Sequence, residues 1–389
     1  MDTNTPLRIA LVAPPQESVP PAAYGGTERV VAELARELTD RGHRVTLFAP
    51  GDSNVPCELI PTVPRALRRA KRMDEEQASL MATVIEVVRL APRFDVIHAH
   101  LDWSNLLVAA LADTPVAMTF HGRLDYSFAP RLLSYAQRGL VAISAAQQAG
   151  LEDLPWEGVV YNGLDLAGSP FGEERTDSLC FVGRMVPEKG VVDAIEIARL
   201  SGRHLRIAAK TGGSARDTDY FETHVKPAAA QADVEFLGEL SGADRDRLFA
   251  ESFATLMPGA WPEPFGLVAI ESLACGTPVI CRPTGALPEI VRDGVDGFHG
   301  DDAQAMAFRL DRVDTLDRRS IRSSVLERFS ATRMTDGYER IYRRLAGGRL
   351  PDEIAIHFDA RRGSDSNRDR QLAALAEDLG TRGSPPVVE

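Results

Sequence analysis

Apolar runs of strand length alternate with helical patterns along almost the whole chain, and this alternation limits the possible folds more than any other feature. Six such runs occur in the first half: LRIALVAP (7–14), RVTLFAP (44–50), FDVIHAH (94–100), TPVAMTF (114–120), GLVAIS (139–144) and GVVYNG (158–163). Between the first two, Val30, Val31, Leu34 and Leu38 recur at helical spacing until Gly42 ends the pattern. This order predicts a parallel sheet with helices on both faces.

The same alternation of strand and helix patterns starts again after a polar linker, LDLAGSPFGEERTD (164–177). The strand candidates there are SLCFVG (178–183), HLRIAAK (204–210), VEFLG (234–238), ATLMP (254–258) and TPVIC (277–281), with a first helix at GVVDAIEIARL (190–200). A chain of 389 residues is long enough for two such domains, each with its own core. We therefore expect an α/β fold of two doubly wound, Rossmann-like domains, with a ligand at the carboxyl ends of the strands, in the cleft between them.

The expected domain limits follow from the same pattern. The first domain covers residues 1–165 and the second covers 166–330. A helix within 331–348, which contains MTDGYERIYRRL, comes after the second sheet and is expected to return to the first domain. Residues 349–389 are polar and are expected to form a flexible tail.

The charge and the cysteine content limit the classes of function that this chain could have. The net charge of −12 disfavours non-specific nucleic-acid binding. No apolar run is long enough for a signal peptide core or a membrane span. The four cysteines form no C-x-x-C pair and are expected to be reduced core residues of a cytoplasmic protein. The basic stretch RALRRAKR (65–72) could touch anionic lipid or an acidic acceptor, although such a stretch is more often a solvated helix face.

Two glutamates, Glu263 and Glu271, lie eight positions apart in PEPFGLVAIESLACGTPVI (262–280). Pro264 favours an extended Glu263, so a helix should begin close to Phe265 and Gly266 and end before Gly276. The free N–H groups at its start suit a phosphate. Eight residues span roughly 12 Å, enough for one carboxylate to meet a sugar and the other a ribose across a diphosphate. A surface glutamate followed by an ion-paired one would show the same spacing.

Two further segments join a strand to a helix and could also contact a diphosphate. In VGRMVPEKG (182–190), Gly183 allows a tight backbone, and Arg184 and Lys189 could clamp the phosphates. In YGGTERV (24–30), Gly25 and Gly26 let backbone N–H groups approach a ligand. Ordinary solvated loops or turns are the alternatives for both segments. YGGTERV is not G-x-G-x-x-G, which disfavours a nicotinamide cofactor.

Histidine and aspartate residues supply weaker signals. His121 in TFHG (119–122) ends a strand at the expected cleft, where it could bond a sugar hydroxyl or act as an acid or base, unless it is a structural histidine. His98 and His100 have no third ligand nearby, so a metal is not expected. The triplet DTD (217–219) is expected in a solvated loop rather than at a metal.

Taken together, these motifs resemble the retaining, GT-B fold glycosyltransferases of family 4, also called group 1. The resemblance runs in order from residue 7 to about residue 345 and rests on YGGTERV, GH-R-VTLF, VIHAH, TFHG, VYNGLD, VGRMVPEKG, EPFGLVAIESLACGTPVI and EIVRDGVDGF. It implies that the first domain binds the acceptor and the second the nucleotide sugar. It also implies retention of the anomeric configuration without an essential metal or cofactor, by front-face attack with the departing diphosphate as base.

The resemblance also implies a role for each matching residue. Glu263 would face the donor sugar, Glu271 would hold the donor ribose, and His121 would lie beside the sugar. Arg184 and Lys189 would stabilise the diphosphate, backbone N–H groups near Phe265, Gly266 and Leu267 would touch phosphate, and Gly25 and Gly26 would close over it. The segment AAKTGG (208–213) departs from the family pattern and leaves the role of Lys210 open.

We thus expect a cytoplasmic glycosyltransferase that moves a hexose from a nucleotide sugar, with UDP-glucose favoured, to a saccharide, lipid or small-molecule acceptor. The alternatives are a GDP-mannose-dependent mannosyltransferase, a nucleotide-sugar epimerase of the same fold, and a non-catalytic sugar-nucleotide-binding partner subunit. Peripheral contact with a membrane and pairing with a second copy of the chain are left open, and no nucleic-acid partner is expected.

Overall fold

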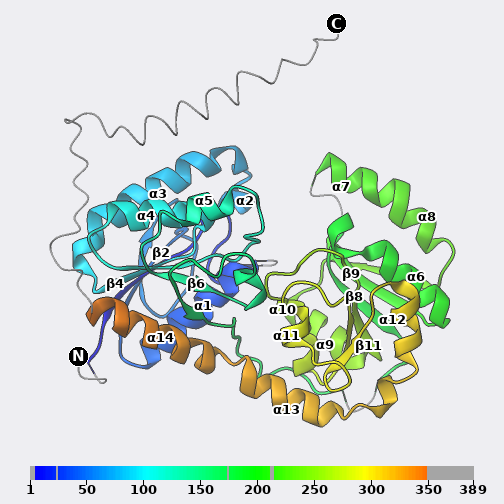
Figure 1. The fold of residues 1–389 in the computed structure, drawn as a ribbon. Coiled ribbons are helices and arrows are strands. Elements are labelled where there is room, and N and C mark those ends of the chain that lie inside the picture. The colour runs from blue at the N-terminus through cyan, green and yellow to red at the C-terminus, as the bar shows by residue number, and fades with distance from the viewer. Residues whose placement is uncertain (1–4, 23–24, 173–174, 211–213, 348–389) are drawn as a thin grey trace, which may run out of the picture. The chain divides into compact units, whose positions relative to one another are not determined.

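Two parallel β-sheets carry the fold within residues 5–22, 25–172, 175–210 and 214–347, which are the residues that the computed structural model describes (Figure 1). The first sheet has the strand order β3-β2-β1-β4-β5-β6-β7, and the second has the order β10-β9-β8-β11-β12-β13. All the neighbouring strands pair in parallel. The predicted pair of doubly wound, Rossmann-like sheets is therefore confirmed.

The strands of the first sheet are β1 (Arg8–Val12), β2 (Arg44–Ala49), β3 (Glu58–Pro61), β4 (Val96–Ala99), β5 (Val116–Thr119), β6 (Leu140–Ala142) and β7 (Trp156–Val159). Those of the second are β8 (Leu179–Arg184), β9 (Leu205–Lys210), β10 (Val234–Gly238), β11 (Ala254–Met257), β12 (Val279–Cys281) and β13 (Gly297–His299). The sequence pattern did not indicate β3 and β13, which are short strands at sheet edges, and the predicted strand at 158–163 begins two residues after the start of β7.

The helices are α1 (Gly26–Asp40), α2 (Leu67–Ala70), α3 (Glu76–Leu90), α4 (Asn105–Leu111), α5 (Ala129–Leu133), α6 (Val191–Ser201), α7 (Ala215–Tyr220), α8 (Lys226–Ala229), α9 (Gly242–Glu251), α10 (Leu267–Ala274), α11 (Leu287–Ile290), α12 (Ala303–Leu310), α13 (Arg318–Arg328) and α14 (Ala331–Gly347). Short 3-10 helices include η4 (Ala146–Gln148) and η5 (Pro187–Lys189). One expectation was wrong, and a second was only partly right. The DTD triplet lies in α7, because Ser214 caps this helix by accepting a hydrogen bond from the Asp217 amide. The basic stretch 65–72 is helical only in α2.

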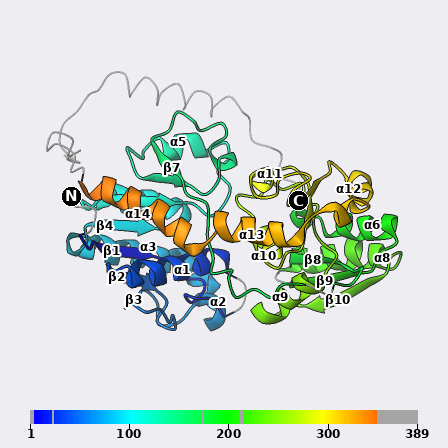
Figure 2. The same cartoon turned by 90° about the horizontal axis from the view of Figure 1, so that it is seen from below.

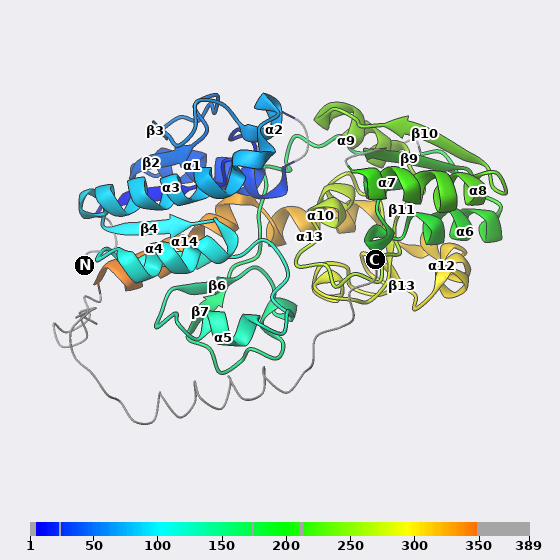
Figure 3. The ribbon, with the colours of Figure 1, turned by 90° about the horizontal axis from the view of Figure 1, so that it is seen from above.

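Alternate residues of each central strand pack against different helices. In β1, Ile9 and Leu11 belong to a core that includes α1 and α14, whereas Ala10 and Val12 face a core that includes α3 and α4. Figure 3 shows α3 and α4 side by side. In the second sheet, α6 and α12 share one core, while α9 lies in a separate cluster with Cys180, against which Val268 of α10 also packs. Both sheets are therefore covered on two faces.

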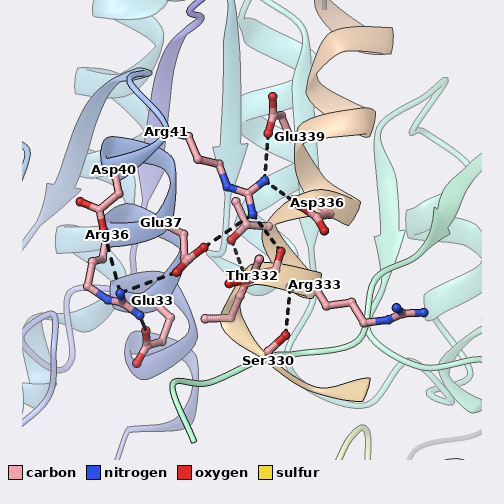
Figure 4. Close-up of polar contacts among 12 residues, drawn as sticks. Glu33, Arg36, Glu37, Asp40, Arg41, Ser330, Thr332, Arg333, Asp336 and Glu339 are labelled. Carbon is pink, nitrogen blue, oxygen red and sulfur yellow. Dashed lines mark hydrogen bonds and ion pairs between the residues drawn. The ribbon is translucent and has the colours of Figure 1, made fainter. Parts of the chain in front are cut away.

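The last helix packs on the first sheet. Helix α14 contacts α1, β4 and β5, and Figure 2 shows it alongside β4. Arg41, just after α1, holds the start of α14 (Figure 4). Its guanidinium donates hydrogen bonds to Asp336 at 2.7 Å, to Glu339 at 3.0 Å and to the Thr332 carbonyl at 3.0 Å. A charged network thus fixes α14 against α1.

One hydrophobic cluster contains residues from both halves of the chain, so the expectation of a separate core for each domain was incomplete. It joins Leu11 of β1, Ile270 of α10 and Tyr338 of α14. Nearby, the chain crosses between the sheets twice, and the two crossings are hydrogen-bonded to each other: Leu164 N–H donates to the Phe329 carbonyl, and Ala331 N–H donates to the Leu164 carbonyl.

The predicted tail, 349–389, lies outside the described residues. Across the residues that are described, no helix has both the length and the apolar character of a membrane span.

Candidate active site

Each strand order contains one switch point, where the chain has filled one side of the first strand of the sheet and continues on its other side. These points lie between β1 and β4 in the first sheet and between β8 and β11 in the second. Ligands of doubly wound sheets bind at the carboxyl ends of strands at such points. The loop after β8 carries Lys189, and the loop after β11 carries Glu263. In the first sheet, α1 follows β1, and His121 follows β5.

The N-termini of α1 and α10 approach each other. A Cβ atom on Gly26, the first residue of α1, would lie 3.2 Å from Leu267 Cδ1, at the first residue of α10. The first hydrogen bonds of α10 run from the Ala269 and Ile270 amides to the Gly266 carbonyl, so the preceding amides lie outside the helical ladder. Two helix N-termini in contact form a favourable environment for an anion.

Glycine is required at two positions of this environment. A Cβ on Gly25 would lie 2.8 Å from Pro21 Cβ and 2.9 Å from Glu28 Oε2, which leaves no room for a side chain. Gly266 has φ +108°, a conformation that side-chain-bearing residues rarely adopt. By contrast, a Cβ on Gly183 would meet the Phe181 ring at an ordinary 3.6 Å, so the protein itself does not require glycine there. Close approach of a ligand at Gly183 stays a prediction.

Lys189 and Glu263 form an ion pair beside the start of α10. Lys189 Nζ lies 2.5 Å from Glu263 Oε2, and about a fifth of each side chain is exposed. Arg184, the last residue of β8, is exposed, and its side chain forms no ion pair or hydrogen bond with the described residues. Phe265, between Glu263 and the helix, is buried against Phe329 at a centroid distance of 5.7 Å. The site therefore combines one paired cation with a second that has no partner among the described residues.

Glu271 lies on α10, is 4% exposed and is bracketed by two arginines. Its Oε1 atom is 2.5 Å from Arg29 Nη1, on α1, and 3.0 Å from Arg245 Nη2, on α9. Neither contact has hydrogen-bond geometry. Oε1 is therefore a buried oxygen without a hydrogen-bond donor in the described part of the chain. The arginines thus neutralise the carboxylate without satisfying its hydrogen-bonding capacity.

His121 belongs to a row of three histidines. His121 Nε2 lies 2.9 Å from His100 Nδ1, and the rings of His100 and His98 have centroids 3.9 Å apart. His98 is held by Tyr342 Oη at 2.6 Å and by Thr119 Oγ1 at 2.8 Å, so it has a structural role. Burial lowers the pKa of His121 to about 4. His121 is therefore neutral near pH 7, although part of its side chain is still accessible.

Glu28 is a buried carboxyl in the first turn of α1, beside Gly25. It is 6% exposed, and burial raises its pKa to about 7. No role was predicted for Glu28 from the sequence, although it lies within the motif YGGTERV. Arg29 was missed in the same motif, three positions after Gly26. Arg245 carries no local signal that could have identified it.

Other contacts between the two halves were also not foreseen. Ser144 Oγ donates a hydrogen bond to the Pro264 carbonyl at 2.8 Å, next to Glu263. Glu289, on α11, accepts hydrogen bonds from the amides of Ala145 and Ala146 and from Tyr161 Oη. Lys210, whose role the sequence left open, pairs with Glu239 at 3.7 Å. Within the described ranges, no group of three or more histidine, cysteine, aspartate or glutamate side chains could hold a metal ion.

Comparison with known proteins gives consistent matches over both halves. Residues 24–167 match the family described as glycosyltransferase family 4, and residues 170–317 match the family described as glycosyl transferases group 1. Glycogen synthase from Mycobacterium tuberculosis is 26% identical over 329 residues, which cover 72% of this chain and 79% of that protein.

Solved structures match over a similar extent. AviGT4, a glycosyltransferase involved in avilamycin A biosynthesis, is 27% identical, with a TM-score of 0.65 over 88% of this chain and 99% of its own. Alr3699/HepE from Anabaena, solved in complex with UDP-glucose, is 20% identical, with a TM-score of 0.63 over 86% of this chain and 99% of its own. The matches thus extend over most of the chain and include both sheets.

Proposed function

Because this chain belongs to the group 1, family 4 glycosyltransferases of the GT-B fold, we propose that it transfers a hexose from a nucleotide sugar to an acceptor with retention of anomeric configuration. We propose UDP-glucose as the donor to test first, since a protein of the same fold has been solved with it. GDP-mannose is the second donor to test. The four free cysteines support a reducing, cytoplasmic setting.

The observation that carries this proposal is the position of the charged groups around α10. Glu263 precedes the helix and Glu271 lies on it, with the Lys189 ammonium beside the first carboxylate. A diphosphate at the start of α10 would meet the helix N-terminus, Lys189 and Arg184. Glu263 would then be available to the hexose and Glu271 to the ribose.

The proposed reaction breaks the bond between the anomeric carbon and the diphosphate oxygen. Positive charge develops on the hexose and negative charge on the departing phosphate, where Arg184 and Lys189 stabilise it. The acceptor hydroxyl attacks from the same face, and its proton passes to the departing diphosphate. Neutral His121 would hydrogen-bond the sugar rather than place a second positive charge beside it.

A donor panel tests the proposal without knowledge of the acceptor. The purified protein would be mixed with UDP-glucose, GDP-mannose and ADP-glucose, and melting temperature and hydrolysis would be measured. We expect one nucleotide series to raise the melting temperature and the matching sugar to be hydrolysed slowly. Absence of both effects with every donor would overturn the proposed activity.

The acceptor can be sought once the donor is known. Saccharides, lipids and small polyhydroxylated molecules would be offered with labelled donor, and products would be separated by mass. Retention would be read from the anomeric coupling constant of the product. Vesicle binding and the mass in solution would test the two contacts that the sequence leaves open, with a membrane surface and with a second copy of the chain.

A further inference from the structure

Arg29 links the first helix of the chain to the carboxylate that we assign to the donor ribose. Its Nη1 atom lies 2.5 Å from Glu271 Oε1, and Arg245 Nη2 lies 3.0 Å from the same oxygen. Arg29 belongs to α1, over the first sheet, whereas Glu271 and Arg245 belong to helices over the second. A group from the first domain therefore acts directly on a site of the second.

The contact is unusual for a buried ion pair. Glu271 is 4% exposed, and Arg29 keeps 27% of its side chain exposed. A buried carboxylate normally accepts hydrogen bonds on both oxygens, but Oε1 accepts none from the described residues. Both arginines make their closest approach to Oε1, and no hydrogen bond to Oε2 is formed in the described ranges. The carboxylate thus retains unused hydrogen-bonding capacity.

Arg29 also lies close to the start of α10. It follows Gly26 by three positions, on the helix whose first residue packs against Leu267. The contact between α1 and α10 therefore places the backbone of Arg29 within reach of Glu271. A displacement of α1 relative to α10 that separates Arg29 from Glu271 would weaken the field on this carboxylate, because the Coulomb energy of the pair falls as the separation grows.

We propose that Arg29 is a donor-positioning residue, which orients Glu271 so that its second oxygen accepts hydrogen bonds from the ribose hydroxyls. This inference rests on the proposed function, in which Glu271 meets the ribose. Two guanidinium groups on Oε1 restrict rotation of the carboxylate and turn Oε2 toward the ligand. With Arg29 removed, Arg245 alone holds the carboxylate, and the ribose loses a pre-oriented acceptor.

Ribose hydroxyls are common to all nucleoside diphosphates, so the effect of Arg29 should not depend on the base. It should depend on the 2′- and 3′-hydroxyl groups. A purely structural ion pair would instead affect every ligand that needs the folded site.

The test compares ligands with and without these hydroxyls. Calorimetry would measure binding of UDP and of 2′,3′-dideoxy-UDP to the full chain and to the variants Arg29→Gln, Arg29→Lys and Glu271→Ala. Arg36→Gln is the matched control, because Arg36 lies on the same helix and pairs with Glu33 at 2.7 Å. Melting temperatures would confirm that each variant is folded. If Arg29→Gln does not fold, Arg29→Lys replaces it in the comparison.

We expect Arg29→Gln to weaken UDP about tenfold and to leave dideoxy-UDP unchanged, with Arg29→Lys in between and Arg36→Gln like the wild type. Equal weakening of both ligands, or no weakening of either, would overturn the role of Arg29. The Glu271→Ala variant separates this failure from that of the proposed function. If Glu271→Ala likewise weakens UDP and dideoxy-UDP equally, or weakens neither, the ribose assignment itself is wrong.

Discussion

The Lys189 ammonium lies 2.5 Å from the Glu263 carboxylate, so the cation assigned to the diphosphate and the anion assigned to the hexose are direct partners. The two residues come from different loops, after β8 and after β11. Each holds the other at the start of α10. A change at one therefore alters the charge available at the other, and the two cannot be treated as independent sites.

Replacement of Lys189 should mainly affect the chemical step. We expect Lys189→Ala to lower turnover about a hundredfold or more, because the departing diphosphate loses a cation in the transition state. Donor hydrolysis at saturating donor would measure this. Lys226→Ala, which removes a surface lysine paired with Glu222 on its own helical segment, is the control and should behave like the wild type. Near-normal turnover of Lys189→Ala would contradict the assignment.

The two glutamates should differ in their effect on UDP. We expect Glu271→Ala to weaken UDP by about 1.5–3 kcal/mol, as for a lost hydrogen bond to a charged group. Glu263→Ala should leave UDP binding unchanged or slightly tighter, since it frees Lys189, while turnover falls. Calorimetry and hydrolysis rates would measure both effects.

Glu271→Ala also leaves Arg29 and Arg245 without their carboxylate, so Glu271→Gln should be measured beside it to separate binding from stability. If the two alanine variants lose UDP affinity equally, or if neither does, the carboxylates do not lie on opposite sides of a diphosphate.

His121 should stay neutral throughout the physiological range. Because burial lowers its pKa to about 4, the unfolded chain takes up a proton near pH 6.5 while the folded chain does not. The stability that depends on neutral His121 is therefore present above pH 6.5 and lost as the pH falls toward 4. NMR titration of the imidazole signal that disappears in His121→Gln would measure the pKa. Titration near 6.5 would contradict the buried environment.

Glu28 should make the folded protein less stable as the pH rises. Its pKa rises from 4.5 to about 7 on folding, so between these values the folded state holds a proton that the unfolded state has lost. The favourable contribution of neutral Glu28 to the stability is complete below pH 4.5 and is lost as the pH rises past 7, and it amounts to about 3 kcal/mol.

Urea unfolding at pH 5 and pH 8 would show this loss, and Glu28→Gln should remove it. Glu33→Gln, on the same helix, should retain the wild-type dependence. An unchanged pH dependence in Glu28→Gln would mean that Glu28 ionises normally in the folded protein.

The sequence by itself determined the two sheets, the helix after Glu263 and the position of His121 beyond a strand. Period-two and period-3.6 patterns report which face of an element is buried, and glycine and proline mark where it ends. These signals are local, so they located α1, α6 and α10 closely. They were weak for β3 and β13, because the strand sequences ELIP and GFH contain no run of more than two apolar residues.

Only the tertiary structure decided which side chains meet. The pairing of Lys189 with Glu263 depends on β8 and β11 being neighbours in the sheet, and the contact of Arg29 with Glu271 depends on α1 packing against α10. The buried state of Glu28 likewise comes from elements that surround it. Local sequence patterns do not predict such contacts, because strand order and helix packing bring together groups that are far apart in the chain.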